Sequence, residues 1–111
     1  MEKPLTDGVV VNRKTKQLIL PQDVIWMEGA INYTYMYLKN GKRLLLCQTL
    51  KSLTNQFAEY GFVRVHRKVL LNRSYIKEFN RCSLSFILTN GQEIEVSRRR
   101  LLYLKYNEGL E

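Results

Sequence analysis

The sequence predicts a mainly β domain of short antiparallel strands, with one short helix near residues 49–59. Apolar residues recur mostly with a period of two, as expected for half-buried strands. Two Asn-Gly pairs, at 40–41 and 90–91, each lie between two such segments, which is typical of β-hairpins. Helical spacing of apolar residues is clear in a single segment. These observations favour packed hairpins with one helix lying on a sheet.

The strands are expected in a definite order along the chain. A first hairpin covers residues 9–20, turns at 12–16 and is closed by Pro21, which cannot continue a central strand. Composition rich in Val, Ile, Tyr and Trp then marks residues 23–28, 31–38, 42–48, 83–89 and 92–97. Both Asn-Gly pairs suit type I′ turns, in which both central residues need a positive φ. Residues 101–104 fit either a final strand or a short helix.

The helix is predicted from its spacing and from its two ends. Leu50, Leu53 and Phe57 recur at helical intervals, so they share a face that can lie on a sheet. Thr49 can cap the amino end, because its hydroxyl accepts a hydrogen bond from the first turn. Gly61 suits the left-handed conformation that commonly follows a helix.

Length and charge limit the classes of function. The 111 residues are expected to form one domain, 1–111. The chain has 18 Lys and Arg against 10 Asp and Glu, a formal net charge of +8. This balance favours a polyanionic partner, either nucleic acid or an anionic membrane surface. A basic protein without such a partner is the alternative.

No cofactor or metal site is expected. Cys47 and Cys82 stand among apolar residues and are expected to be buried free thiols in a reducing cytosol. With a single histidine, His66, no tetrahedral zinc spacing can be drawn. The first residues lack the apolar stretch of a signal peptide, and no run of about 18 apolar residues predicts a transmembrane helix. We therefore expect a cytoplasmic protein without a small-molecule substrate.

Residues 61–72, GFVRVHRKVLLN, combine a strand pattern with a cluster of positive charge. The apolar residues of one parity are Val63, Val65, Val69 and Leu71. Arg64, His66 and Lys68 take the opposite parity, whereas Arg67 falls on the apolar one. Burying Arg67 without a partner would be costly, so the backbone should turn or bulge there and carry it outward. The segment contains no acidic residue that could neutralise these cations.

A second basic cluster, Arg98, Arg99 and Arg100, directly follows the strand expected at 92–97. Arginine side chains suit phosphate and the O6/N7 edge of guanine. The two clusters rise from strand ends in a half of the chain that is poor in acids. Contact with nucleic acid is therefore favoured over a solvated charge run.

Other classes of function have less support. An enzyme has the least, since no nucleophile can be tied to His66 by spacing and no carboxylate motif occurs. Tyr33, Tyr35 and Tyr37 share one strand face, which normally packs a sheet; the alternative is a stacking platform for single-stranded RNA. The remaining class is a non-catalytic protein-interaction module, such as one with an anionic membrane-associated partner.

Taken together, these segments resemble the LytTR DNA-binding domain of bacterial response regulators. The matching features occur in one order over residues 23–104: a strand with Glu28, then Asn32-Tyr33, the TLKSL helix, FVRVHRKVLLN, the YIKEF strand, and NG followed by VSRR. Each segment alone is a weak sign of the family, but the ordered set of segments is highly specific for it. The upstream sequence, from about Gly8, resembles the first strands of that domain. The resemblance implies an elongated β sandwich of small antiparallel sheets.

The resemblance also implies how DNA is bound. In this family, loops rather than a recognition helix enter successive major grooves of a bent duplex. From the basic clusters and the resemblance together, the expected DNA-contacting residues are Asn32, Thr34, Tyr35, Arg64, His66, Arg67, Lys68, Arg98, Arg99 and Arg100. Thr34 and Arg98 correspond to base-reading positions, Arg67 to one that reaches bases or the intervening minor groove, and Arg99 to a phosphate neighbour.

The sequence departs from the family pattern in a few places. Lys68 adds a charge where Ser usually follows His-Arg, and Thr34 is short and neutral. No receiver domain precedes the motifs, so the expectation is a stand-alone regulator of transcription that binds specific double-stranded DNA, or a fragment of a longer one. Further expected partners are a second copy on paired sites and a sensor or membrane-associated regulatory protein.

Overall fold

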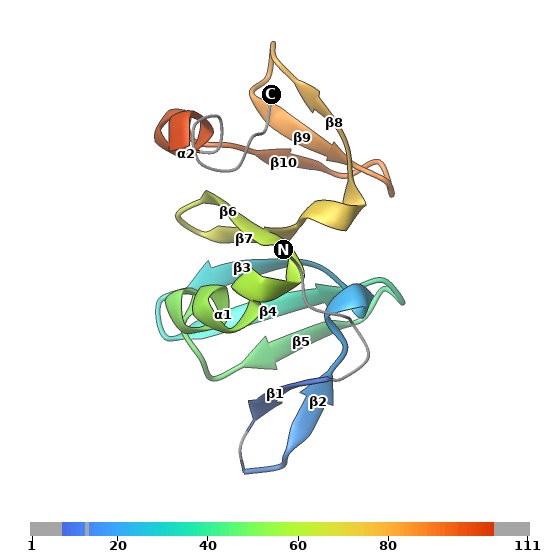
Figure 1. The fold of residues 1–111 in the computed structure, drawn as a ribbon, viewed down its shortest axis with the longest axis vertical. Helices are drawn as coiled ribbons and strands as arrows, with labels where there is room; N and C mark the ends of the chain where they lie inside the picture. Colours follow the sequence, from blue (N-terminus) through green and yellow to red (C-terminus); the bar gives the residue numbers. More distant parts are fainter. Residues whose placement is uncertain (1–7, 13, 104–111) are drawn as a thin grey trace.

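The structure, a computed structural model, describes residues 8–12 and 14–103. The molecule is a stack of three antiparallel sheets and measures 43 × 30 × 26 Å along its principal axes. Figure 1 shows the sheets one above another, with helix α1 against one face of the central sheet. The expected mainly β fold, an elongated sandwich with a short helix, is confirmed.

The central sheet has five strands in the order β5-β4-β3-β7-β6. Its strands are β3 (Val24–Ala30), β4 (Tyr33–Leu38), β5 (Arg43–Leu46), β6 (Phe62–His66) and β7 (Val69–Asn72). The outer layers are a hairpin of β1 (Val9–Asn12) and β2 (Gln17–Ile19), and a sheet of β8 (Ile76–Asn80), β9 (Ser85–Leu88) and β10 (Glu93–Glu95). Neighbouring strands in each layer are antiparallel.

Strands β3, β6 and β7 of the central sheet are buried on both faces, whereas Leu45 of the edge strand β5 is exposed. On one face Met27 and Leu70 join a core with Phe57 of the helix and residues of the β1–β2 hairpin. On the other face Val65 joins a second core with Phe86 of the three-stranded sheet. Protein cores are close-packed, so a strand held between two of them has little freedom to shift. The turns that connect β3, β6 and β7 to their neighbours therefore start from fixed positions.

Helix α1 (Leu50–Phe57) forms where the helical spacing predicts it. Thr49 is its N-cap, and the Thr49 Oγ1 accepts a hydrogen bond from the Ser52 amide at 3.1 Å. The three expected apolar residues are buried: Leu50, Leu53 and Phe57. A short 3-10 turn (Ala58–Tyr60) follows, and then Gly61 with a φ of 83°. Both predicted ends of the helix are confirmed.

The two Asn-Gly hairpins form, but their turns are not of the predicted type. Gly41 and Gly91 each have a φ of 88°, whereas the Asn before each of them does not have a positive φ. In the first hairpin the Gly41 amide donates to Leu38 O at 3.0 Å and the Leu38 amide donates to Lys42 O at 2.9 Å. Equivalent bonds occur over residues 88–92. Each connection is therefore a type I turn closed by a left-handed glycine, which is a common longer hairpin loop.

Two more details differ from or complete the expectations. Cys47 and Cys82 are exposed rather than buried, because Cys47 follows the end of an edge strand and Cys82 lies in the β8–β9 turn. The segment for which strand and helix were both open forms a helix as far as it is described, α2 (Arg98–Tyr103), and Leu104 lies outside the described residues.

Candidate nucleic-acid interface

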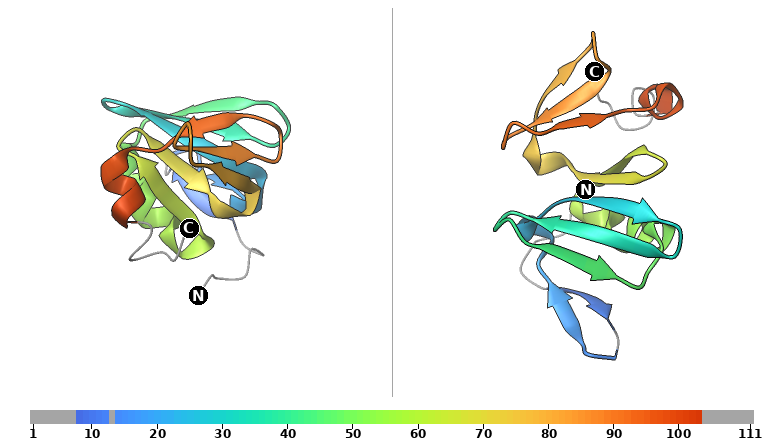
Figure 2. Two further views of the ribbon diagram at one scale, coloured as in Figure 1. Left: turned by 90° about the horizontal axis from the view of Figure 1, so that it is seen from above. Right: turned by 180° about the vertical axis from the view of Figure 1, so that it is seen from behind.

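Three segments that carry the expected DNA-contacting residues lie along one side of the molecule. They are the β3–β4 turn at Ile31 and Asn32, the β6–β7 turn at Arg67 and Lys68, and the beginning of α2 at Arg98. In Figure 1 all three are at the left, one above another along the long axis. The view from above in Figure 2 also places them on one side. We call this side the basic edge.

The β6–β7 turn presents its two cations through an irregularity in the strand pairing. The register shifts between Arg64 and His66, and Arg67 and Lys68 form the exposed turn. The Lys68 amide donates to His66 Nδ1 at 3.2 Å, and Lys68 O accepts from the Gly29 amide at 2.8 Å. The turn is thus joined to β3. The expectation that the backbone carries Arg67 outward is confirmed.

Arg64 supports this turn instead of projecting with it. Its half-buried guanidinium donates to His66 O at 3.2 Å, to Thr54 Oγ1 at 3.3 Å and, through Nη2, to Arg67 O. A guanidinium has five N–H donors in a fixed plane, so a single side chain can bind two carbonyls of the turn and a hydroxyl of α1. Arg64 is therefore placed to position Arg67.

Ser97 joins the beginning of α2 to β6. Its amide donates to Val65 O at 3.2 Å, and its Oγ accepts from the Arg100 amide at 3.2 Å, which caps the first turn. Arg98 and Arg99 are exposed, and Arg100 is half-buried. The three arginines therefore begin a helix, which corrects their expected place at the end of a strand.

The β6–β7 turn and the beginning of α2 line one hollow of about 320 Å³. Its lining residues are His66, Arg67, Ser97, Arg99 and Arg100, and none of these described residues is a carboxylate. Just beneath, burial lowers the pKa of Arg64 and the positive charge of Arg100 lowers it further. Cations this close repel one another, and an anion between them would relieve the repulsion.

Carboxylates from other strands also lie near the turn, although residues 61–72 themselves contain none. A second hollow, of about 290 Å³, contains His66 and Lys68 together with Glu28 of β3 and Glu93 and Glu95 of β10. Among the described residues, no ion pair joins these carboxylates to Lys68. Sequence reasoning missed them because they come from strands far from residues 61–72 along the chain.

The β3–β4 hairpin corrects one expected site residue. Thr34, expected to read a base, is 0% exposed, and its Oγ1 donates to Gln48 O at 2.8 Å. A buried hydroxyl with a partner is not presented to a ligand, so Thr34 holds the beginning of the hairpin in this structure. Asn32 is exposed. Tyr35 is half-buried, and its ring centroid lies 4.5 Å from the guanidinium carbon of Arg43.

The side chain that this turn does present is Ile31, which is 96% exposed and has a φ of 24°. Because Ala30 pairs with Tyr33, the turn has two central residues, and Gly is usual at the first when its φ is positive. A β-branched residue there costs roughly 1–3 kcal/mol of backbone strain. Sequence reasoning did not single out Ile31. An Ile-Asn pair between two strand segments is the signal that could have found it.

The tyrosines of β4 are mostly engaged in packing. The Tyr37 ring stacks on Trp26, with centroids 4.3 Å apart, and its hydroxyl donates to Glu28 Oε1 at 2.9 Å. Burial and this carboxylate raise the pKa of Tyr37. Tyr35 lies against Arg43, which leaves Tyr33 as the exposed ring of this face, at 49%. This arrangement gives little support to a stacking platform for single-stranded RNA.

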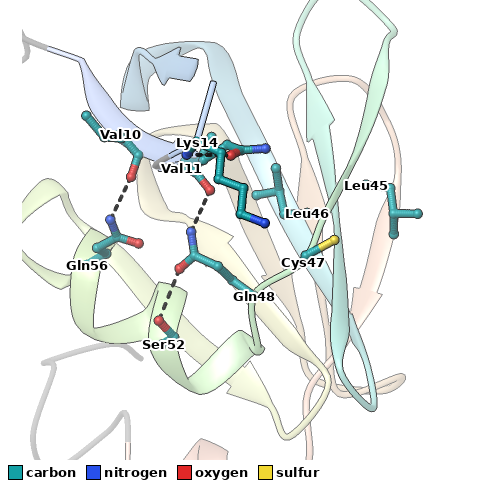
Figure 3. A pocket seen from close by; sticks show the side chains of 10 residues that line it. Val10, Val11, Lys14, Leu45, Leu46, Cys47, Gln48, Ser52 and Gln56 are labelled. Atoms are coloured by element: carbon teal, nitrogen blue, oxygen red, sulfur yellow. Dashed lines mark hydrogen bonds between the residues drawn. The ribbon is translucent and has the colours of Figure 1, made fainter. Parts of the chain in front are cut away.

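A larger hollow, of about 580 Å³, lies between β1, β5 and α1 (Figure 3). Gln48 and Gln56 donate across it to Val11 O at 2.7 Å and Val10 O at 2.9 Å, which fastens the first hairpin to the rest of the molecule. The side chain of Lys14 also lines it. None of the expected DNA-contacting residues does.

Two general features of the described residues bear on the class of protein. They include no helix that is both long enough and apolar enough to span a membrane. They also include no group of three His, Cys, Asp or Glu side chains arranged to hold a metal ion.

A cationic turn and a cationic helix start, aligned along one edge of a firmly packed β scaffold, are typical of a nucleic-acid-binding domain. Comparison with known families gives the particular type: the family model of the LytTr DNA-binding domain matches residues 14–107. The chain belongs to the LytTr DNA-binding domain family. This is a non-catalytic family, and its function is DNA binding in transcriptional regulation.

A solved structure shares the fold. It is described as the LytTr DNA-binding domain of a methyl-accepting/DNA response regulator from Bacillus cereus. It superposes with a TM-score of 0.75 and 18% sequence identity, over 95% of this chain and 99% of that chain. Among curated proteins, none matches this sequence.

Proposed function

We propose that this domain binds specific sequences of double-stranded DNA, with the turns of the basic edge entering the major grooves. The observation that carries the proposal is the hollow that Arg67 and His66 share with Arg99 and Arg100. A duplex that lies across the edge requires two cationic projections on a common side, and the β6–β7 turn and the beginning of α2 are these two projections. Projections on opposite faces could not contact one duplex together.

The dimensions of the molecule support this arrangement. Successive major grooves on one side of B-DNA are about 34 Å apart, one helical turn. The long axis of the domain measures 43 Å, and the three segments of the basic edge follow that axis (Figure 1). The molecule as a whole is therefore longer than one groove spacing, and the basic edge occupies the middle of that length, between the β1–β2 hairpin and the β8–β9 turn.

Charge on the two sides of the β6–β7 turn supports a particular position for the duplex. The hollow with Arg99 and Arg100 attracts phosphate, whereas the hollow with Glu28, Glu93 and Glu95 repels it. Phosphates should therefore follow the arginine side, and the carboxylates should mark the limit of the bound surface.

The expected contacts divide between affinity and specificity. Phosphate contacts supply most of the affinity, and contacts to base edges supply the sequence preference. The exposed Arg99 suits a phosphate, and the exposed Lys68, which borders the carboxylate hollow, suits one at the limit of the bound surface. Arg98 and Arg67 suit guanine edges. The exposed amide of Asn32 suits adenine N6 and N7. Thr34 makes no proposed contact because its hydroxyl is buried. Arg64 acts indirectly, by holding the turn that carries Arg67.

The test is a selection of bound duplexes from a random pool with the full chain. The expected result is a shared motif among the selected duplexes, with binding lost in Arg67→Ala and retained in Lys42→Ala. Lys42 is a matched control because it is an exposed cation in the β4–β5 turn, outside the basic edge. A pool without enrichment would overturn sequence-specific binding. Displacement of the duplex by equal amounts of single-stranded RNA would favour an RNA binder instead.

A further inference from the structure

The β3–β4 turn places an apolar side chain on the basic edge. Ile31 is 96% exposed, and its neighbour Asn32 is also exposed. An isolated exposed Ile is ordinary on a protein surface. Here, however, the exposure coincides with a φ of 24°, a backbone conformation that β-branched residues rarely adopt. Gly would suit this turn better, so an exposed Ile held in an unfavourable conformation is a candidate for contact with a ligand.

The turn is held in place by three contacts of its hairpin. The buried Thr34 hydroxyl binds Gln48 O at 2.8 Å, and the Gly29 amide binds Lys68 O at 2.8 Å. A Cβ built on Gly29 would lie 3.1 Å from the Leu50 Cβ, so the strand runs close against α1. Ile31 therefore projects from a fixed support, joined by a hydrogen bond to the turn that carries Arg67. A support of this kind can place a single apolar group accurately against a ligand.

We propose that Ile31 contacts the C5-methyl group of a thymine in the major groove, beside an adenine that Asn32 recognises. This inference rests on the proposed function and names a specificity-determining residue for it. Among base edges in the major groove, the thymine methyl is the apolar feature, and apolar side chains contact it. The side-chain amide of Asn pairs with N6 and N7 of adenine. Ile31 and Asn32 together would thus select an A·T-containing step.

The test uses a duplex obtained by the selection and copies of it in which deoxyuridine replaces one thymine at a time. This replacement removes only the methyl group. For the unmodified chain, one such replacement should weaken binding about fourfold, the value of one buried methyl. Ile31→Gly should weaken binding to the thymine duplex by at least that factor and should be insensitive to the same replacement. Its midpoint of thermal unfolding should rise by a few degrees, because the strain that is relieved exceeds the additional backbone entropy that Gly loses on folding.

The control variant is Leu18→Ala, which truncates another exposed apolar side chain, 62% exposed, on the β1–β2 hairpin. It should bind both duplexes as the unmodified chain does. If Ile31→Gly keeps full affinity, or keeps its sensitivity to deoxyuridine, the thymine contact is wrong while the proposed function stands. If the unmodified chain binds no duplex at all, the proposed function fails, and the Ile31 contact fails with it.

Discussion

Arg64 and Arg67 lie in the same basic segment, yet one is bound internally and the other is exposed. Three donors of Arg64 are used on His66 O, Thr54 Oγ1 and Arg67 O, whereas Arg67 lies at the tip of the turn. The sequence predicted a cationic segment whose backbone had to bend. It could not predict this division of roles, because that depends on the register shift between Arg64 and His66.

The Arg64→Lys variant tests whether Arg64 acts through its planar group or through its charge. Lysine keeps the charge, but its ammonium cannot reach the three acceptors with the geometry of a guanidinium. We expect the free energy of unfolding to fall by about 1 kcal/mol. Duplex affinity should fall several-fold, with an unchanged dependence on salt. Urea unfolding and duplex titration measure the two effects. Wild-type values for both would mean that only the charge matters.

Glu93 provides a prediction on pH. The hydroxyls of Ser85 and Ser83 donate to its carboxylate and hold its pKa below the usual value of 4.5. Because the folded-state pKa lies below the unfolded one, this stabilisation is present above pH 4.5 and is lost as the pH falls through the folded-state pKa. Ser85→Ala should therefore destabilise the domain more at pH 7 than at about pH 3. Urea unfolding at both pH values measures this, and an equal loss at the two would contradict it.

At the scale of elements, the strand and helix assignments were largely predictable, but details of their ends were not. The period of two and the Asn-Gly pairs located the hairpins. The turn type, however, depends on how many residues lie between the last paired residues, and that number is three at residues 39–41, because Leu38 and Lys42 are still hydrogen-bonded. The helical outcome at 98–103 depends on Ser97, which caps α2 and binds Val65 O of β6. Both depend on partners that are not adjacent in sequence.

The two cationic elements of the basic edge should respond differently to loss of charge. Arg98→Ala, at the beginning of α2, should cost about 1–3 kcal/mol of binding free energy and relax the preference at one base pair. Lys68→Ala, in the β6–β7 turn, should weaken all duplexes alike and reduce the salt slope by about one unit. Titration of selected and shuffled duplexes over a range of salt separates the two. Equal losses of Arg98→Ala on both duplexes would make Arg98 a phosphate contact, and a sequence-selective loss in Lys68→Ala would refute its role.

At the scale of the whole molecule, the composition predicted a polyanionic partner but could not show where it binds. The net charge of +8 does not indicate where the positive side chains gather in the folded molecule. Strand order brings segments near residues 31, 67 and 98 to one edge, and it also brings Glu28, Glu93 and Glu95 near Lys68. Similarly, the alternating pattern of β4 placed Thr34 in a strand. Only the fold shows that the Thr34 hydroxyl is buried and donates to the backbone oxygen of Gln48.

The whole edge determines the dependence of binding on salt. If about six phosphates are neutralised, the logarithm of the binding constant should fall against the logarithm of salt concentration with a slope near −5. Titrations of the selected duplex from about 50 to 200 mM salt measure this slope. A slope near zero, or no detectable duplex binding at low salt, would instead favour a protein-interaction module whose positive charge is incidental.

The burial of β3, β6 and β7 of the central sheet on both faces has a consequence for the DNA. Its turns project from strands that are packed between two cores, so they cannot move far to follow a straight duplex. The adjustment must then come from the nucleic acid, and its elastic cost varies with sequence. We expect readily deformed pyrimidine–purine steps to be favoured between the contacted positions, and stiff A-tracts to be disfavoured there. Base pairs that no side chain touches would thus help to choose the operator.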